Sequence, residues 1–190
     1  MKVCLFFFLI LPGLLWGNDK IDSLQKVIDN DPPLPEKVES MHNLAELYYY
    51  QDTEKSKKLA SEIFTISSAA KYKKGIWISY NISGYLKYIA SHYDSAIYFF
   101  QKALTIDTPK ELIDEQIFSY YWLASCYVQK SEYLLAEENY DKSLSLSVRN
   151  SKENAAAKAY MGLGILNYQQ SRYEKAIYNY LKADSIYGDE

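Results

Sequence analysis

The sequence YDSAIYFF at residues 93–100 recurs along the chain at a fixed offset of forty positions. Its counterparts are TEKSKKLA at 53–60, YLLAEENY at 133–140 and YEKAIYNY at 173–180. Internal repetition with a period of about 20–50 residues is the mark of a repeat architecture, in which each unit packs mainly on its neighbours. The pattern therefore directs attention to what a stack of units holds together.

Small residues keep the same offset as these phrases. One set is Gly84, Ala124 and Gly164, and the other is Ala96, Ala136 and Ala176. Glycine inside a helix costs about 1 kcal/mol relative to alanine, so its recurrence indicates a packing need. We expect both sets to lie where the two helices of a unit approach closely.

Each unit is expected to be a pair of helices. Residues 93–106 carry apolar side chains at spacings of three and four, which predicts an amphipathic helix, and residues 133–146 and 173–186 repeat the pattern. A longer helix is expected to precede each of these helices. Thr108, Pro109 and Glu111 form a capping-box pattern that starts one such longer helix, and we expect this helix to run to about Gln129. Ser171 and Glu174 form a second capping-box pattern, expected to open the last helix. No stretch alternates as a strand would, so the chain is expected to be all-α.

The composition argues against several functions. The chain has 190 residues, a formal net charge of −3 and 20 tyrosines. Near-neutral charge favours neither nucleic acid nor an anionic membrane as a partner. Only Arg149 and Arg172 supply guanidinium groups, which argues against a phosphate-reading surface.

Residues 1–17 are predicted to be a secretory signal peptide. Lys2 precedes an almost wholly apolar run to Trp16, and Pro12, Gly13 and the small Gly17 follow the order of such a peptide. An uncleaved anchor is the alternative. Residues 18–33 are expected to form a short helix with a proline-rich link, and the protein is expected to be exported, in the periplasm or on a membrane facing it.

Residues 34–190 resemble tetratricopeptide repeats, with units at roughly 34–70, 71–107, 108–148 and 149–190. The family pattern places an aromatic residue, Leu-Gly or Leu-Ala and a tyrosine in the first helix, then Ala-x-x-x-aromatic in the second. The residues that match it in the third, fourth and second units are Tyr120, Leu123, Ala124, Tyr127, Ala136 and Tyr140; Tyr160, Leu163, Gly164, Ala176 and Tyr180; and Gly84, Ala96 and Phe100. The resemblance implies a right-handed superhelical solenoid of four helix pairs that binds proteins or peptides.

The chain departs from the family pattern at several points. Its period of forty positions exceeds the usual one, which is about 34 residues; we interpret the surplus as extra turns at the start of each first helix. Ser83 stands where leucine is expected and Asn167 where tyrosine is expected, and the first unit is degenerate. The export signal and tyrosine-rich repeats are also similar to the periplasmic sensor regions of Bacteroidetes-type membrane regulators. The last helix still carries Ile177 and Leu181, so we expect either a continuation of the chain toward a membrane anchor or a partner, including a second copy, at this end.

One face of the first helices is the candidate binding groove, since first helices line the concave side of such a stack. The face follows i, i+4, i+7 spacing in the second and fourth units and i, i+4, i+8 spacing in the third. Its residues are Asn81, Tyr85 and Tyr88; Tyr121, Ser125 and Gln129; and Met161, Ile165 and Tyr168, with His42, Glu46 and Tyr49 near it in the first unit. Tyrosine anchors and amide groups suit a peptide segment. The alternative is that these tyrosines merely pack on neighbouring repeats.

No catalytic or cofactor site is predicted. His42 and His92 lack partners at metal-ligand spacing, and Cys126 has no nearby histidine, so we interpret it as a buried small hydrophobe. The function predicted from the sequence is noncatalytic binding by the sensory or scaffolding part of a larger signalling protein, without metal or cofactor. A freestanding periplasmic adaptor and a small-molecule receptor or accessory subunit are the alternatives.

Overall fold

A stack of helices makes up the described part of the chain. The computed structural model describes residues 12–106 and 112–187, with only the backbone given for residues 12–18. Its helices are α1 (Pro12–Asp29), α2 (Leu34–Tyr48), α3 (Thr53–Ala69), α4 (Lys73–Ile89), α5 (Tyr93–Leu104), α6 (Ile113–Gln129), α7 (Tyr133–Arg149), α8 (Glu153–Gln169) and α9 (Tyr173–Tyr187). These residues include no strand, so the predicted all-α solenoid is confirmed there.

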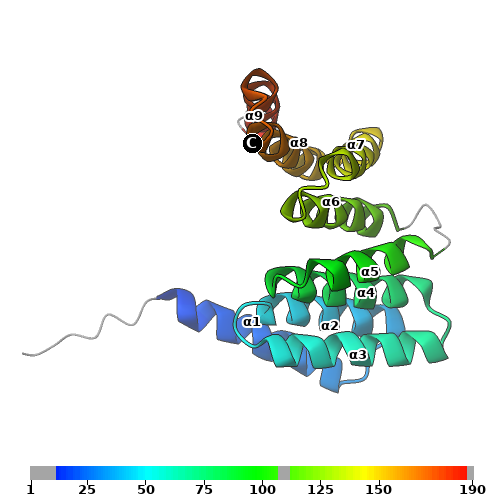
Figure 1. Cartoon of the computed structure of the whole chain (residues 1–190). Coiled ribbons are helices and arrows are strands. Elements are labelled where there is room, and N and C mark those ends of the chain that lie inside the picture. The colour runs from blue at the N-terminus through cyan, green and yellow to red at the C-terminus, as the bar shows by residue number, and fades with distance from the viewer. Residues whose placement is uncertain (1–11, 107–111, 188–190) are drawn as a thin grey trace, which may run out of the picture.

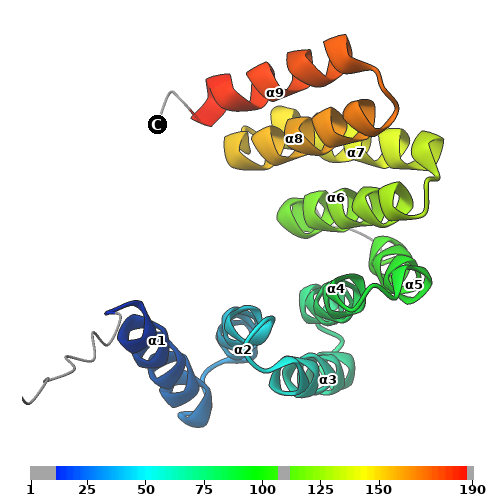
Figure 2. The same ribbon diagram turned by 60° about the vertical axis from the view of Figure 1, so that its left-hand side comes forward.

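The helices are arranged as an arc of antiparallel pairs. The pairs are α2–α3, α4–α5, α6–α7 and α8–α9, and the first helices α2, α4 and α6 each also contact the first helix of the next pair. Figure 2 shows α2, α4, α6 and α8 along the inner side of the arc, with α3, α5 and α7 outside them. The first helices therefore line the concave side, and each unit packs mainly on its neighbours.

The repeat period is made up of two long helices and two short connections. α7 and α8 each have 17 residues, and residues 150–152 and 170–172 connect them to their successors. The surplus over the usual period therefore lengthens second helices as well, whereas we expected it only at the start of first helices. First helices start at Lys73, Ile113 and Glu153, which keeps the offset of the sequence repeat.

The same turn closes five of the described helices, at positions 20 or 40 residues apart. Its central residue has a left-handed backbone, with φ between 53° and 60°, at Lys71, Ser91, Ser131, Ser151 and Ser171. The next residue donates its N–H to the carbonyl five positions earlier at 2.8–2.9 Å, the pattern of a Schellman motif. Because the turn follows first and second helices alike, the array has a structural period half as long as its sequence repeat.

Three boundaries differ from those predicted. Ser171 is not the N-cap of α9; its left-handed backbone ends α8, and Arg172 separates it from the start of α9. α1 begins at Pro12, before the short helix predicted within residues 18–33, and proline is compatible with the first turn of a helix. α6 begins at Ile113, and the predicted capping box at Thr108 lies in residues 107–111, outside the described part.

The core follows the seam between the two layers of helices. Its largest fully buried side chains include Trp77, Phe100, Met41, Leu44 and Ile63. Among the helices that the structure describes, none has both the length and the apolar character needed to cross a membrane.

Candidate functional site

Two of the three predicted binding residues of α4 lie between helices and are not open to a ligand, whereas Tyr88 is half-buried. Asn81 is 4% exposed; its amide donates to the Glu115 carbonyl at 3.3 Å, and its oxygen accepts from the Ser119 hydroxyl at 2.7 Å. Tyr85 is 8% exposed, and its ring centroid lies 4.7 Å from that of Trp122. Both side chains are covered by α6, which corrects their assignment to a groove.

Most of the predicted face of α6 is also taken up by internal contacts. Ser125 is buried, donates to the Tyr121 carbonyl at 3.0 Å and shares a 3.0 Å hydrogen bond with the Tyr140 hydroxyl. Tyr121 is half-buried with its ring 5.5 Å from that of Tyr140, and burial raises its pKa. Gln129 is exposed at the end of the helix.

The same positions are open on α8. Met161, Ile165 and Tyr168 are 42%, 43% and 61% exposed. They are the counterparts, two repeats later, of Asn81, Tyr85 and Tyr88, and the described chain has no later first helix to cover them. The face predicted as a concave groove is therefore the face on which each first helix packs against the first helix of the next unit. Among the described first helices, this face is exposed on α8.

α9 extends this open surface with residues that are covered in the inner units. Tyr173, Ile177 and Tyr180 are 56%, 58% and 37% exposed, whereas Phe100 and Tyr140, the counterparts of Tyr180, are 0% and 3% exposed. We call the surface formed by Met161, Ile165, Tyr168, Tyr173, Ile177 and Tyr180 the end face. It is an exposed apolar surface that takes in two helices, a feature typical of interaction sites.

One pair of rings shows that the end face already has the geometry of an occupied one. Tyr168 and Tyr173 lie 5.8 Å apart at an interplanar angle of 62°. Tyr88 and Tyr93, their counterparts in the second unit, lie 5.8 Å apart at 61°, and there Trp122 of α6 packs 4.9 Å from Tyr88. The end face thus keeps the shape that receives a helix in the second unit.

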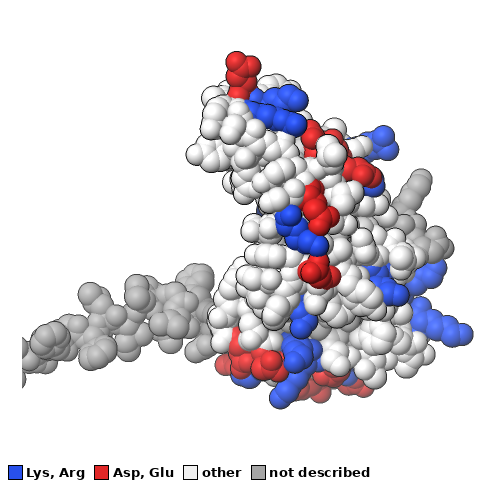
Figure 3. Space-filling model, viewed as in Figure 1, with Lys and Arg blue, Asp and Glu red and all other residues white. Residues whose placement is uncertain are grey.

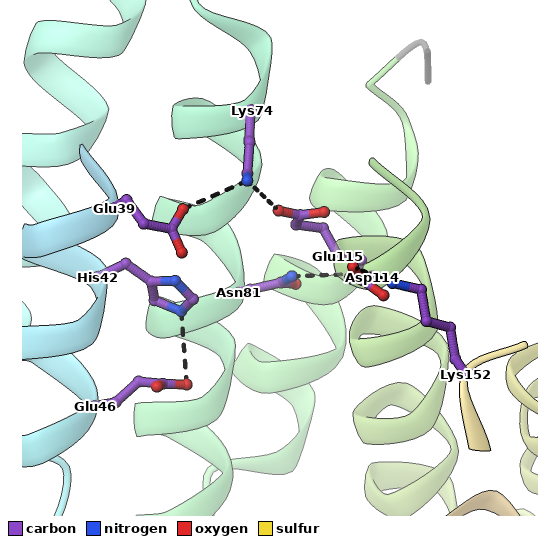
Figure 4. A network of polar contacts seen from close by, with 8 residues as sticks. All are labelled: Glu39, His42, Glu46, Lys74, Asn81, Asp114, Glu115 and Lys152. Carbon is purple, nitrogen blue, oxygen red and sulfur yellow. Dashed lines mark hydrogen bonds and ion pairs between the residues drawn. The ribbon is translucent and has the colours of Figure 1, made fainter. Parts of the chain in front are cut away.

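Charged side chains on the stack pair with one another between units. Lys74 lies 3.4 Å from Glu39 and 3.3 Å from Glu115, and Lys152 lies 2.9 Å from Asp114, so the links run from α2 to the start of α8 (Figure 4). On the side seen in Figure 3, acidic and basic groups lie next to one another along the middle of the stack, whereas the basic groups at the right-hand edge have no acidic neighbour in view. His42 contacts Glu46 within its own helix at 3.7 Å.

The small residues lie where helices touch. A methyl group on Gly84 would meet the Phe100 ring at 2.8 Å, and one on Gly164 would meet the Tyr180 ring at 2.4 Å. The alanines at the repeating positions, Ala96, Ala124, Ala136 and Ala176, are at most 2% exposed. Gly162 lies at a similar contact, since Tyr140 of the preceding helix would lie 2.4 Å from a methyl group there.

Reactive chemistry has little support in this part of the chain. The described residues contain no group of three or more histidine, cysteine or acidic side chains that could hold a metal ion. Cys126 is buried, and burial raises the pKa of its thiol to about 12. A thiol with so high a pKa is protonated, and hence a poor nucleophile, near neutral pH.

An arc of antiparallel helix pairs, each packed mainly on its neighbours, is the architecture of a helical repeat protein. Residues 115–187 match the family model of the tetratricopeptide repeat, which confirms the predicted family resemblance for the third and fourth units. These two units are therefore similar to tetratricopeptide repeats. No curated protein gives a significant match.

Solved structures share the fold along nearly the whole chain. BtubC (BKLC) from P. vanneervenii is 21% identical with a TM-score of 0.74, covering 93% of this chain and 72% of its own. MamA is 19% identical with a TM-score of 0.58, covering 97% of this chain and 98% of its own. These similarities confirm the predicted right-handed solenoid. Repeats of this type generally bind proteins or peptides and serve as noncatalytic scaffolds.

The α9 half of the end face was not among the predicted site residues. Its signal in the sequence was the pair of apolar residues Ile177 and Leu181 on the last helix. Conversely, Asn81 and Tyr85 were misassigned because groove and stacking faces of a first helix share the same periodicity.

Proposed function

We propose that this protein is a noncatalytic interaction module whose end face binds an amphipathic helix of a partner protein. The observation that supports this most is the open copy of a surface that is covered by α6 and α8 in the inner units. An apolar helix in an apolar groove is a common mode of peptide recognition. The partner helix would present an aromatic side chain to Tyr168, as Trp122 does to Tyr88.

The chemistry of the end face favours an uncharged contact surface on that partner. The six residues that define the face include no ionisable carboxylate or amine. Lys74 and Lys152, the lysines at the starts of first helices, are paired with acidic groups of neighbouring units. Burial of apolar area would thus supply most of the binding free energy, at about 25 cal/mol per Å².

A peptide that copies α6 tests the proposal directly. The probe is the fluorescein-labelled sequence of residues 113–129 with Cys126→Ser, and the assay is fluorescence anisotropy with the full chain. Ile165→Glu and Ile177→Glu are each expected to weaken binding at least tenfold, because either buries a carboxylate without a partner. Leu134→Glu is the matched control, since Leu134 is 82% exposed on α7, away from the end face.

Two further measurements sharpen the result. A probe that also carries Trp122→Ala should bind more weakly, because it lacks the ring that would meet Tyr168. Equal binding by the Ile165→Glu, Ile177→Glu and Leu134→Glu variants would refute the proposal. If the chain instead forms a dimer that Ile165→Glu dissociates in analytical ultracentrifugation, a second copy is the occupant and the partner-helix proposal fails.

We also propose that the module is exported and acts as the sensory or scaffolding part of a signalling assembly in the periplasm, tethered to a membrane or free as an adaptor. The apolar run between Lys2 and Gly17 supports export. Expression with a C-terminal epitope tag and cell fractionation would test this; recovery of the tagged, unprocessed chain in the cytoplasm would contradict it.

A further inference from the structure

A second candidate site lies in the second unit, away from the end face. A cavity of about 760 Å³ is bordered by α3, α4 and α5. Tyr49 and Tyr50 line it beside three aromatic side chains that come one from each helix: Phe64, Tyr80 and Phe99, with ring centroids 5.6 Å and 6.4 Å from one to the next. Pockets that hold small molecules measure about 300–1,000 Å³, so this cavity has the size of a ligand site.

The cavity exists because two side chains of α4 differ from those of the later units. Ser83 lines it, whereas the corresponding residues of α6 and α8, Leu123 and Leu163, are 4% and 6% exposed in packed positions. Lys87 also lines it, whereas its counterpart Tyr127 is 8% exposed and accepts a hydrogen bond from Gln101 of α5 at 3.2 Å. The second unit therefore lacks the two bulky groups that fill this space one repeat later.

The charges of the lining point to an anionic ligand. Glu54 is the one carboxylate among the described lining residues, and it already lies 3.6 Å from Lys57. Lys87 is half-buried and forms no ion pair with any residue that the structure describes. A cation in such surroundings is stabilised when an anion reaches it, because burial penalises an unpaired charge.

We propose that this cavity binds a small organic anion with an apolar, ring-containing body. The body packs among Phe64, Tyr80 and Phe99, and the acidic group reaches the ammonium of Lys87. Ser83 leaves the room that the body occupies. The site is separate from the end face, so binding here and helix binding there are independently testable.

Two fluorescent probes with a shared ring system test the charge and the cavity. The anion is 8-anilinonaphthalene-1-sulfonate, and its neutral analogue is N-phenyl-1-naphthylamine. Lys87→Gln is expected to weaken sulfonate binding at least fivefold and to leave binding of the neutral probe unchanged. Lys58→Gln is the matched control, because Lys58 is an exposed residue of α3 that does not line the cavity.

Ser83→Leu tests the cavity itself, since it restores the residue of the later units. It is expected to weaken both probes at least tenfold, with unfolding by urea checked in parallel. All measurements use an Ile165→Glu background, so that probe bound at the end face does not contribute. Sulfonate binding that Lys87→Gln leaves unchanged, or that Lys58→Gln weakens equally, overturns the proposal; so does full probe binding by a folded Ser83→Leu variant.

Discussion

The contact between Gly84 and Phe100 allows a sharp test of how the helix pairs pack. In Gly84→Ala the new methyl carbon would lie 2.8 Å, 2.9 Å and 3.0 Å from three atoms of the Phe100 ring. Carbon atoms in favourable contact lie about 3.5–4.0 Å apart, so the ring must move by roughly 0.5–1 Å. Phe100 is fully buried, with the Phe118 ring centroid 6.4 Å away, and has little room to move.

Two opposing effects set the magnitude. Alanine gains about 1 kcal/mol over glycine inside a helix, whereas overpacking a filled core costs about 1–3 kcal/mol. We therefore expect Gly84→Ala to lower the free energy of unfolding by about 1 kcal/mol. Gly164→Ala should be nearly neutral, because Tyr180 is 37% exposed and its ring can turn outward. Gly164→Leu, with a larger side chain, should cost more than about 2 kcal/mol.

The assay is urea unfolding of each variant beside the unchanged chain, followed by circular dichroism and by tyrosine fluorescence. The distances alone would rank the variants the other way, since the contact at Gly164 is 2.4 Å and that at Gly84 is 2.8 Å. If Gly164→Ala proves more destabilising than Gly84→Ala, the argument from the burial of the opposing ring is refuted.

Three further predictions concern the turns, the buried thiol and alkaline pH. Ser131→Gly and Ser171→Gly should each raise the free energy of unfolding by about 1 kcal/mol, because glycine adopts a positive φ without strain; Ser145→Gly, in the exposed interior of α7, should lower it in the same urea titration. In a Cys4→Ser background, which leaves Cys126 as the single thiol, Cys126 should react with Ellman's reagent only as fast as the chain unfolds, and rapid labelling of the folded chain would contradict its burial. Burial raises the pKa of Cys126 from 9.0 to about 12 and also raises the pKa of Tyr140, so the folded chain holds these protons more tightly than the unfolded chain does. The stabilisation is therefore fully present below pH 9 and declines as the pH rises toward 12. Urea unfolding midpoints measured between pH 8 and 11 should fall accordingly.

The fold could be predicted from the sequence because the residues that set the helix contacts recur at the same positions in several units. Gly84 and Gly164, with alanine between them at position 124, mark one helix contact in three units. The bounds of the helices were harder to predict from the sequence than the fold. Ser171 has a capping-box spacing to Glu174, yet the closing turn of α8 determines its backbone, and nothing local to the sequence separates those two roles.

The candidate sites were only partly readable, for a geometric reason. Tyr85 and Tyr168 lie on the same kind of helix face, but whether such a face is open depends on whether another helix follows it in space. The cavity in the second unit left a clearer trace. Ser83 was visible as a departure from the expected leucine, but its meaning required the shape of the space that the leucine would have filled.

The repeated turn provides positions at which whole repeats can be removed or added. Ser131 and Ser171 have φ values of 60° and 59°, and each is followed at the same distance by the next second helix. Excision of residues 131–170 would join Lys130 to Ser171 and leave one complete turn at the junction. Duplication of the same segment would add a whole unit in register. The length of the array can thus be changed by whole repeats, because each new junction keeps the backbone geometry of the original turn.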